Sequence, residues 1–270
     1  QRLVERKGVQ PESAARWIGT RHGIAAAMLL EAGEVDAALC GGLGDWTRQL
    51  QNILPLIPRQ RGVSRLYSLS ALILPNGALF FCDTHVNVDP TAEQIAEMTL
   101  LAAKTVRRFG LAPKAALLSH SSFGTSHAPG ALKMRKAMSL LKAARPDFEF
   151  DGEMHADTAL VEALREPLIG EGPLKGQANL LIMPSLESAN IAYNLLKALA
   201  DGVAVGFMMI AAVTDMRTAV ILVLLPCIAT TVAVICLSGP FMATLRRYWF
   251  MPLCMLAGAS ITGGISRRQQ

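Results

Sequence analysis

The chain has 270 residues, of which 51% are hydrophobic and 17% are charged, and its formal net charge is +5. This length accommodates one large domain or two ordinary ones. The basic residues are scattered and form no stripe interleaved with aromatic residues, which argues against a nucleic acid as partner. The charges are unevenly distributed, because residues 218–245 contain no Asp, Glu, Lys or Arg.

The cysteines and the N-terminal residues indicate the compartment in which the protein is expected to function. The five cysteines are odd in number and include no CxxC pair, so they indicate neither a disulfide framework nor a zinc site. Cys40 and Cys82 each end an apolar run, and we expect both to be buried thiols in a reduced cytosol. Residues 1–7 lack the apolar segment of a signal peptide. Since the chain also lacks a starting Met, we expect it to begin inside a longer protein.

In chain order, hydrophobic periodicity and turn residues predict helices that alternate with strands. The predicted helices are 11–32, 90–109, 129–144, 157–165 and 186–199. The predicted strands are 35–40, 66–74, 78–82, 115–119, 148–152 and 179–183, with 66–74 and 78–82 forming a hairpin. The clearest helix is 90–109, where Thr91 and Gln94 can form a capping box. This alternation indicates an α/β fold with a mostly parallel sheet and helices on both faces.

The last sixty residues, 211–270, differ in kind. The uncharged run 218–245 is longer than the roughly 20 residues that a helix needs to cross a bilayer. Arg246-Arg247 and Tyr248-Trp249 follow it, as interfacial anchors do. We therefore expect a hydrophobic helical tail with one or two transmembrane helices, the second at 248–266. The alternative is a pair of buried core helices.

Polar side chains follow the predicted strand 78–82, at a position where α/β proteins bind ligands. Asp83 and Asn87 are expected to line a cleft, and Asp89 to cap the helix that begins at residue 90. A calcium loop is rejected, because Val88 occupies its glycine position and Gln94 its final glutamate position. The alternative is that these side chains serve turn and cap geometry only.

A second polar cluster, residues 119–127, follows the predicted strand 115–119. Hydroxyls combined with backbone N–H groups before a helix can hold phosphate. The G-x-S-x-G elbow of a nucleophilic serine is absent, so no catalytic residue is predicted. The candidate cofactor-binding residues of this cluster are Ser119, Ser121, Ser122 and Thr125.

Two further motifs carry weaker signals. Glu153, His155 and Asp157 could bind a metal or transfer protons, but their spacing differs from that of HExxH, and a salt-bridged corner is the alternative. We assign no metal ligands. The glycine run 41–44 lacks the spacing of a phosphate loop, and we expect it to be a tight turn.

Six strings together resemble one family. They are residues 6–11, 83–94, 116–124, 151–155, 173–179 and 190–196. On these strings, residues 2–210 resemble the phosphate acetyl/butyryltransferase family. The resemblance is strongest to the phosphotransacetylase-like C-terminal domain of bacterial bifunctional NADP-dependent malic enzymes.

The resemblance implies two α/β lobes of the isocitrate dehydrogenase type, with a cleft between them that binds coenzyme A or acetyl-CoA and phosphate-like anions. In the malic-enzyme branch the domain would sense acetyl-CoA, and the complete protein would be a cytoplasmic homo-oligomer. NADP and a divalent metal would belong to an upstream malic domain that is absent here. The alternatives are an active phosphate acetyl- or butyryltransferase, or a binding domain attached to the inner membrane through residues 218–266.

The chain departs from the family pattern in three places. The resemblance implies a missing first strand and helix, and Gln51 stands where the family has an arginine, for which Arg48 is a possible substitute. The departure at 207–212 precedes the serine–arginine loop that transferases use. We therefore expect an incomplete, inactive domain at 1–210 and an unrelated tail at 211–270. The tail would be a natural fusion or, as we prefer, a shifted frame or joined fragments, because a domain cut at this point has an open sheet edge.

Overall fold

The computed structural model describes residues 2–34, 46–54, 56–57, 59–200, 203–210, 220–225 and 231–236. Its helices are α1 Arg2–Lys7, α2 Pro11–Thr20, α3 His22–Ala32, α4 Trp46–Ile53, α5 Ala92–Arg108, α6 Pro129–Ala144, α7 Ala156–Leu160, α8 Glu162–Ile169 and α9 Leu186–Leu199. Its strands are β1 Tyr67–Leu74, β2 Gly77–Cys82, β3 Lys114–Leu118, β4 Glu149–Met154, β5 Leu180–Ile182, β6 Val203–Ile210, β7 Val220–Leu225 and β8 Thr231–Cys236. The predicted strand 35–40 and the glycine run 41–44 lie outside the described residues.

The main sheet has six strands in the order β4-β3-β5-β2-β1-β6. The four strands from β4 to β2 are parallel, whereas β1 is antiparallel to both β2 and β6. The predicted hairpin is confirmed, with Leu69 opposite Cys82. Because parallel strands present their carboxyl ends at one edge, the polar segments after β2, β3, β4 and β5 meet there.

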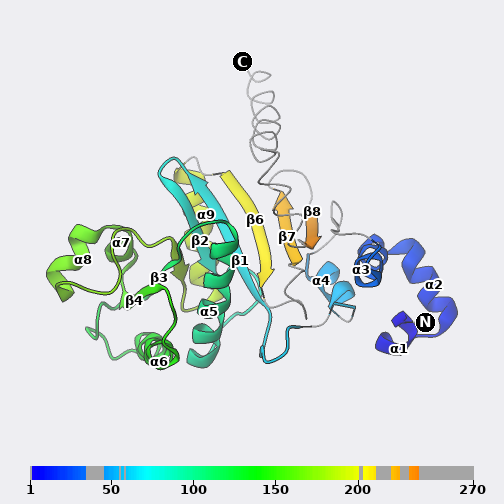
Figure 1. The fold of residues 1–270 in the computed structure, drawn as a ribbon, viewed down its shortest axis with the longest axis horizontal. Coiled ribbons are helices and arrows are strands. Elements are labelled where there is room, and N and C mark those ends of the chain that lie inside the picture. The colour runs from blue at the N-terminus through cyan, green and yellow to red at the C-terminus, as the bar shows by residue number, and fades with distance from the viewer. Residues whose placement is uncertain are drawn as a thin grey trace, which may run out of the picture.

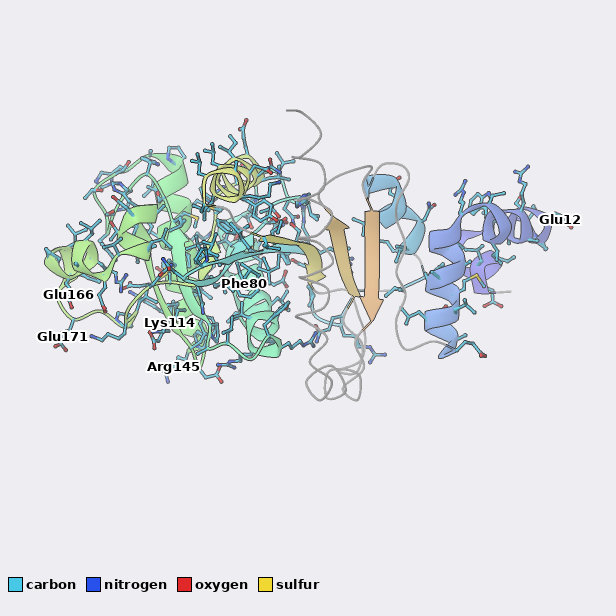
Figure 2. The ribbon with its side chains drawn as sticks, turned by 90° about the horizontal axis from the view of Figure 1, so that it is seen from above. Glu12, Phe80, Lys114, Arg145, Glu166 and Glu171 are labelled. Atoms are coloured by element: carbon cyan, nitrogen blue, oxygen red, sulfur yellow. The ribbon has the colours of Figure 1, made fainter. Side chains whose placement is uncertain are left out.

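Two hydrophobic cores cover the two faces of this sheet. Side chains alternate along a strand, so Ala115 and Leu117 of β3 pack with α5 and α6, while Ala116 and Leu118 pack with α7 and α9. Figure 2 shows the sheet between α9 on one side and α5 on the other, with Phe80 inside it. The prediction of helices on both faces is therefore confirmed.

A third core lies apart from the sheet. It contains Leu3, Ala14, Ile24, Ala27, Ile53, Leu56, Ile57 and Leu66. These residues come from α1–α4 and the segment that leads into β1. Figure 1 shows α1–α3 at the opposite end of the molecule from α7 and α8.

The helix predictions hold where the local signals are strong. The bounds of α6 and α9 match the predicted 129–144 and 186–199. The predicted helix 11–32 is divided at Arg21, whose backbone leaves the helical region at φ −122° and ψ 87°. Gly19 and Thr20 precede this break, and both have low helix propensity. The predicted helix 157–165 is likewise divided, at Val161.

The predicted cap at Asp89 is wrong. The helix begins two residues later than predicted, and Thr91 is its N-cap, with the Thr91–Gln94 capping box formed in both directions. Asp89 instead forms an ion pair with Lys133 of α6.

The predicted helical tail is wrong for the residues that the structure describes there. β7 and β8 form an antiparallel pair, with Val220 opposite Cys236. Val, Ile and Thr dominate both strands, and their β-branched side chains favour extended backbone. No helix in the described ranges combines the length and the apolar character that crossing a membrane requires. The second candidate span, 248–266, lies outside the described residues.

Candidate functional site

Asp83 organises the turn that follows β2. Its side chain is 2% exposed, and its two carboxylate oxygens accept five hydrogen bonds. The donors are Ser68 Oγ, the backbone N–H groups of His85, Val86 and Asn87, and Asn87 Nδ2. The carboxylate is thus engaged inside the turn and gives the turn its shape.

Asn87 connects this turn to the segment that precedes β1. Its Nδ2 donates to Asp83 Oδ2 at 2.6 Å and to the carbonyl oxygen of Leu66 at 2.8 Å. Asn87 is buried, and it lines a pocket of about 840 Å³. Of the two residues predicted for the cleft wall, Asn87 lines this pocket. Asp83 is not part of the lining but accepts a hydrogen bond from Asn87.

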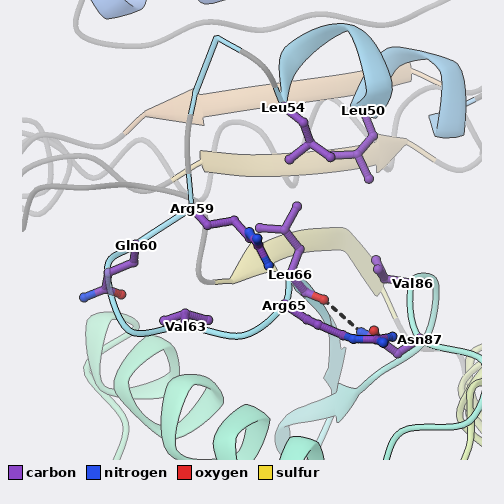
Figure 3. A pocket seen from close by; sticks show the side chains of 9 residues that line it. All are labelled: Leu50, Leu54, Arg59, Gln60, Val63, Arg65, Leu66, Val86 and Asn87. Atoms are coloured by element: carbon purple, nitrogen blue, oxygen red, sulfur yellow. Dashed lines mark hydrogen bonds between the residues drawn. The ribbon is translucent and has the colours of Figure 1, made fainter.

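The pocket combines apolar and cationic walls. Figure 3 shows it between the segment 59–66 and α4, with Leu50 on α4 and Leu54 directly after that helix. The remaining lining residues are Arg59, Gln60, Val63, Arg65, Leu66, Val86 and Asn87. Two guanidinium groups and two side-chain amides therefore accompany five aliphatic side chains. No carboxylate among the described residues forms an ion pair with Arg65.

Glu97 of α5 holds the segment that carries the arginines. Its carboxylate accepts the Ser64 N–H at 2.9 Å and also the hydroxyls of Ser64 and Tyr67. Burial opposes ionisation of Glu97, but these hydrogen bonds together lower its pKa. Burial of Tyr67 and its hydrogen bond to the Glu97 carboxylate raise the pKa of the Tyr67 hydroxyl. Glu97 is therefore an anionic acceptor at neutral pH.

His85 is neutral in this turn. Burial lowers its pKa to about 4, although the neighbouring Asp83 acts in the opposite direction. Its Nδ1 lies 2.8 Å from Thr84 Oγ1. The partly buried His85 thus takes part in the turn through its backbone N–H, which donates to Ser68 Oγ and Asp83 Oδ1, and through its ring contact with Thr84.

The hydroxyl cluster after β3 is joined to the end of β4. Ser121 is fully buried, and its Oγ donates to Glu153 Oε1 at 2.8 Å. Glu153 also accepts the Gly124 N–H at 3.0 Å. Ser122 Oγ accepts the His155 N–H at 3.2 Å, and Thr125 Oγ1 accepts the Ser122 N–H at 3.1 Å. The hydroxyl proton of Ser121 is thus used in the hydrogen bond that joins the loop to β4.

Ser119 and Thr125 are the more accessible members of this cluster. Ser119 is partly buried and accepts the Ser121 N–H at 3.2 Å, while Thr125 is exposed. The structure brings the four predicted hydroxyl residues together in one loop. It separates them from Asp83 and Asn87, because β5 lies between β3 and β2 in the sheet. Strands lie about 4.8 Å apart, so two strand spacings, roughly 10 Å, divide the two sets.

The Glu153, His155 and Asp157 motif is a structural corner. Glu153 bonds to the β3 loop, His155 Nε2 lies 2.9 Å from the His120 carbonyl oxygen, and Asp157 accepts the Thr158 N–H at 2.7 Å. Across the described part of the chain, no group of three or more His, Cys, Asp or Glu side chains is placed to hold a metal ion.

Arg59, Arg65 and Glu97 were missed by the sequence analysis. The two arginines lie in a segment without hydrophobic periodicity, between the helix at 46–53 and β1. Glu97 is a partly buried residue of an amphipathic helix, and its position in the sequence matches that of the charged residues on the polar face of such a helix. Gly62 lies at a positive φ among basic residues in this connecting segment, and such segments often carry binding residues, which was an available signal for the two arginines.

The comparisons with known proteins agree with this fold. The family model described as "Phosphate acetyl/butaryl transferase" matches residues 1–214. The NADP-dependent malic enzyme of Escherichia coli (strain K12) is 44% identical over 205 residues, which are 76% of this chain and 27% of that protein. The phosphate acetyltransferase of Haemophilus influenzae is 31% identical over 210 residues, which are 77% of this chain and 30% of that protein.

A solved structure shows the same architecture. The EutD phosphotransacetylase from Staphylococcus aureus superimposes with a TM-score of 0.69 at 29% identity, covering 79% of this chain and 67% of that one. The chain spans between a quarter and a third of the length of the two curated relatives above. The family match extends over most of its residues, and the chain therefore belongs to the phosphate acetyl/butaryl transferase family.

Proposed function

We propose that this chain binds acetyl-CoA or a closely related acyl-CoA in the pocket lined by Arg59, Arg65 and Asn87. It would act there as the acetyl-CoA-sensing domain of a bifunctional NADP-dependent malic enzyme. The observation that carries the proposal is the composition of the pocket, which places two guanidinium groups beside a wall of aliphatic side chains.

The chemistry of such a ligand matches both walls. Acetyl-CoA carries phosphate groups at one end and a thioester on a flexible, largely uncharged arm at the other. Guanidinium groups bind phosphate through paired N–H donors, and they stay charged at all relevant pH values. The aliphatic residues of α4 and of segment 63–66 suit the arm. A volume of about 840 Å³ falls within the range of roughly 300–1,000 Å³ for small-molecule sites.

The relatives favour the malic-enzyme branch over a free-standing transferase. Identity is 44% to the Escherichia coli malic enzyme and 31% to the Haemophilus influenzae phosphate acetyltransferase over similar lengths. The serine–arginine loop expected of transferases has no counterpart in the sequence after residue 212. Binding without turnover is consistent with both facts. Malate oxidation, its nicotinamide cofactor and its metal would then reside outside this chain.

Calorimetric titration of the complete 270-residue chain with acetyl-CoA tests the binding. We expect saturable heat, and an affinity about tenfold to hundredfold weaker for Arg65→Ala, since a charge-assisted hydrogen bond contributes about 1.5–3 kcal/mol. Lys104→Ala, which removes a positive charge from α5 outside the pocket lining, is the matched control. The absence of heat at millimolar acetyl-CoA would remove the proposal.

Phosphate acetyl- or butyryltransferase activity is the second candidate. The superposition on a phosphotransacetylase favours it. Formation of acetyl-CoA from acetyl phosphate and coenzyme A by the purified chain would establish catalysis and show that the sensing role is incomplete. We expect no turnover above a heat-denatured control.

A further inference from the structure

The backbone on either side of Arg65 is held from two directions. Residue 64 is bonded to α5, and residue 66 is bonded to the turn after β2. Arg65 itself has an exposed side chain at the pocket. The position of its guanidinium therefore depends on these backbone contacts rather than on packing around the side chain.

The first contact is the Glu97 carboxylate. It accepts the Ser64 N–H at 2.9 Å through Oε1, and the hydroxyls of Ser64 and Tyr67 through Oε2. The Arg65 N–H also faces this carboxylate and favours its ionised form. Tyr67 is fully buried in β1, so its hydroxyl gives the carboxylate a rigid partner inside the sheet. The Glu97 carboxylate is thus held by Tyr67 of β1, and it in turn holds the backbone at Ser64.

The second contact is Asn87. Its Nδ2 donates to the Leu66 carbonyl oxygen at 2.8 Å and also to the carboxylate of the buried Asp83, which holds the Asn87 side chain in place. Figure 3 shows this hydrogen bond beside Arg65. Arg65 thus sits between two anchored neighbours.

We propose that Glu97 is a positioning residue, which does not line the pocket and acts on the ligand only by holding Arg65 at the pocket wall. This inference rests on the proposed function, because it assigns a ligand contact to Arg65. Asn87 lines the pocket and could touch a ligand directly, whereas Glu97 is absent from the lining. The two roles can therefore be separated by experiment.

A double-mutant cycle tests the proposal on the complete chain, with acetyl-CoA as the probe. We expect Glu97→Ala to weaken binding about tenfold when Arg65 is present, and less than twofold in the Arg65→Ala background, since residues that act through one another are not additive. A general loss of structure would weaken binding equally in both backgrounds. Glu93→Ala, which removes an exposed carboxylate one turn earlier on α5, is the matched control and is expected to bind as the unmodified chain does.

Amide hydrogen exchange of residues 59–66 gives a readout that does not need the ligand. Loss of the Glu97 acceptor is expected to speed exchange at Ser64 and Arg65, and Glu93→Ala is not. Additive losses in the cycle, or unchanged exchange in Glu97→Ala, would overturn the positioning role. If the unmodified chain binds no acetyl-CoA while exchange still accelerates, the proposed function fails and the anchoring by Glu97 stands without a ligand to position.

Discussion

Replacing Asp83 by Ala should cause one of the largest losses of stability available to a single substitution in this chain. The carboxylate accepts five hydrogen bonds while 2% exposed, and for two of the donors Asp83 is the acceptor that would be lost without replacement. These are the backbone N–H groups of Val86 and Asn87. The His85 N–H keeps Ser68 Oγ, and Asn87 Nδ2 keeps the Leu66 carbonyl oxygen.

The expected magnitude follows from these two groups. A buried donor that loses its acceptor costs about 1–3 kcal/mol. The Asn87 N–H is buried and the Val86 N–H is partly buried, so the two together give at most about 2–6 kcal/mol. Domains of this kind are stable by about 5–15 kcal/mol, and the substitution removes a large part of that free energy. Asp83→Asn keeps one acceptor oxygen, and we expect roughly half the loss.

Urea unfolding followed by far-UV circular dichroism measures the effect. The matched control is Asp89→Ala, six residues along the same turn, whose carboxylate is 79% exposed and pairs with Lys133. Exposed ion pairs contribute about 0–1 kcal/mol, so this control should unfold close to the unmodified chain. An Asp83→Ala or Asp83→Asn chain that loses no more stability than Asp89→Ala would refute the role assigned to this carboxylate.

Three further predictions concern groups away from the pocket. Burial raises the pKa of Asp151, whose Oδ2 lacks a hydrogen-bond partner. Because the pKa of Asp151 is higher in the folded than in the unfolded chain, the stability that Asp151 contributes is complete below the unfolded pKa. This stability is lost as the pH rises through the folded pKa. Asp151→Asn should therefore raise the melting temperature at pH 7 and lose that advantage near pH 4, and an equal shift at both pH values would contradict the assignment. Thr91→Ala removes the cap of α5 and should cost about 1 kcal/mol in urea unfolding, whereas Thr105→Ala, inside the same helix, should cost less. Arg165→Met should cost about 3–5 kcal/mol, because the buried guanidinium donates to the carbonyl oxygens of Thr158, Leu174 and Gly176, and a loss below 1 kcal/mol would show that these oxygens find other donors.

Much of the sheet and its helices could be predicted from the sequence, because their causes are local. The bounds of α6 and α9, the β1–β2 hairpin and the Thr91–Gln94 capping box depend on residues within one element or one turn. Hydrophobic periodicity and capping report such contacts directly. The breaks at Arg21 and Val161 were missed, since each interrupts a pattern that continues on both sides.

In the tail, the local sequence pattern did not predict the backbone conformation correctly. A long uncharged run is compatible with a membrane helix and with buried strands, because hydrophobicity alone does not select the backbone conformation. The β-branched residues of β7 and β8 favoured strands, and the length of the run outweighed them in the prediction.

The pocket was decided by tertiary structure alone. The hydroxyl residues and Asp83 were found by the rule that parallel strands end at one edge. Their polar atoms turned out to be hydrogen-bonded within these loops or, for Ser121 and Ser122, to the end of β4. Arg65 and Glu97 are 32 positions apart, as the numbering shows, and neither lies in a motif. Outside the tail, the sequence determined most of the segments that become helix and strand, since neighbouring residues largely settle that choice. The fold alone determined that the Glu97 carboxylate binds the segment that carries Arg65, since only the packing of α5 against β1 brings Glu97 within hydrogen-bond distance of Ser64 and Tyr67.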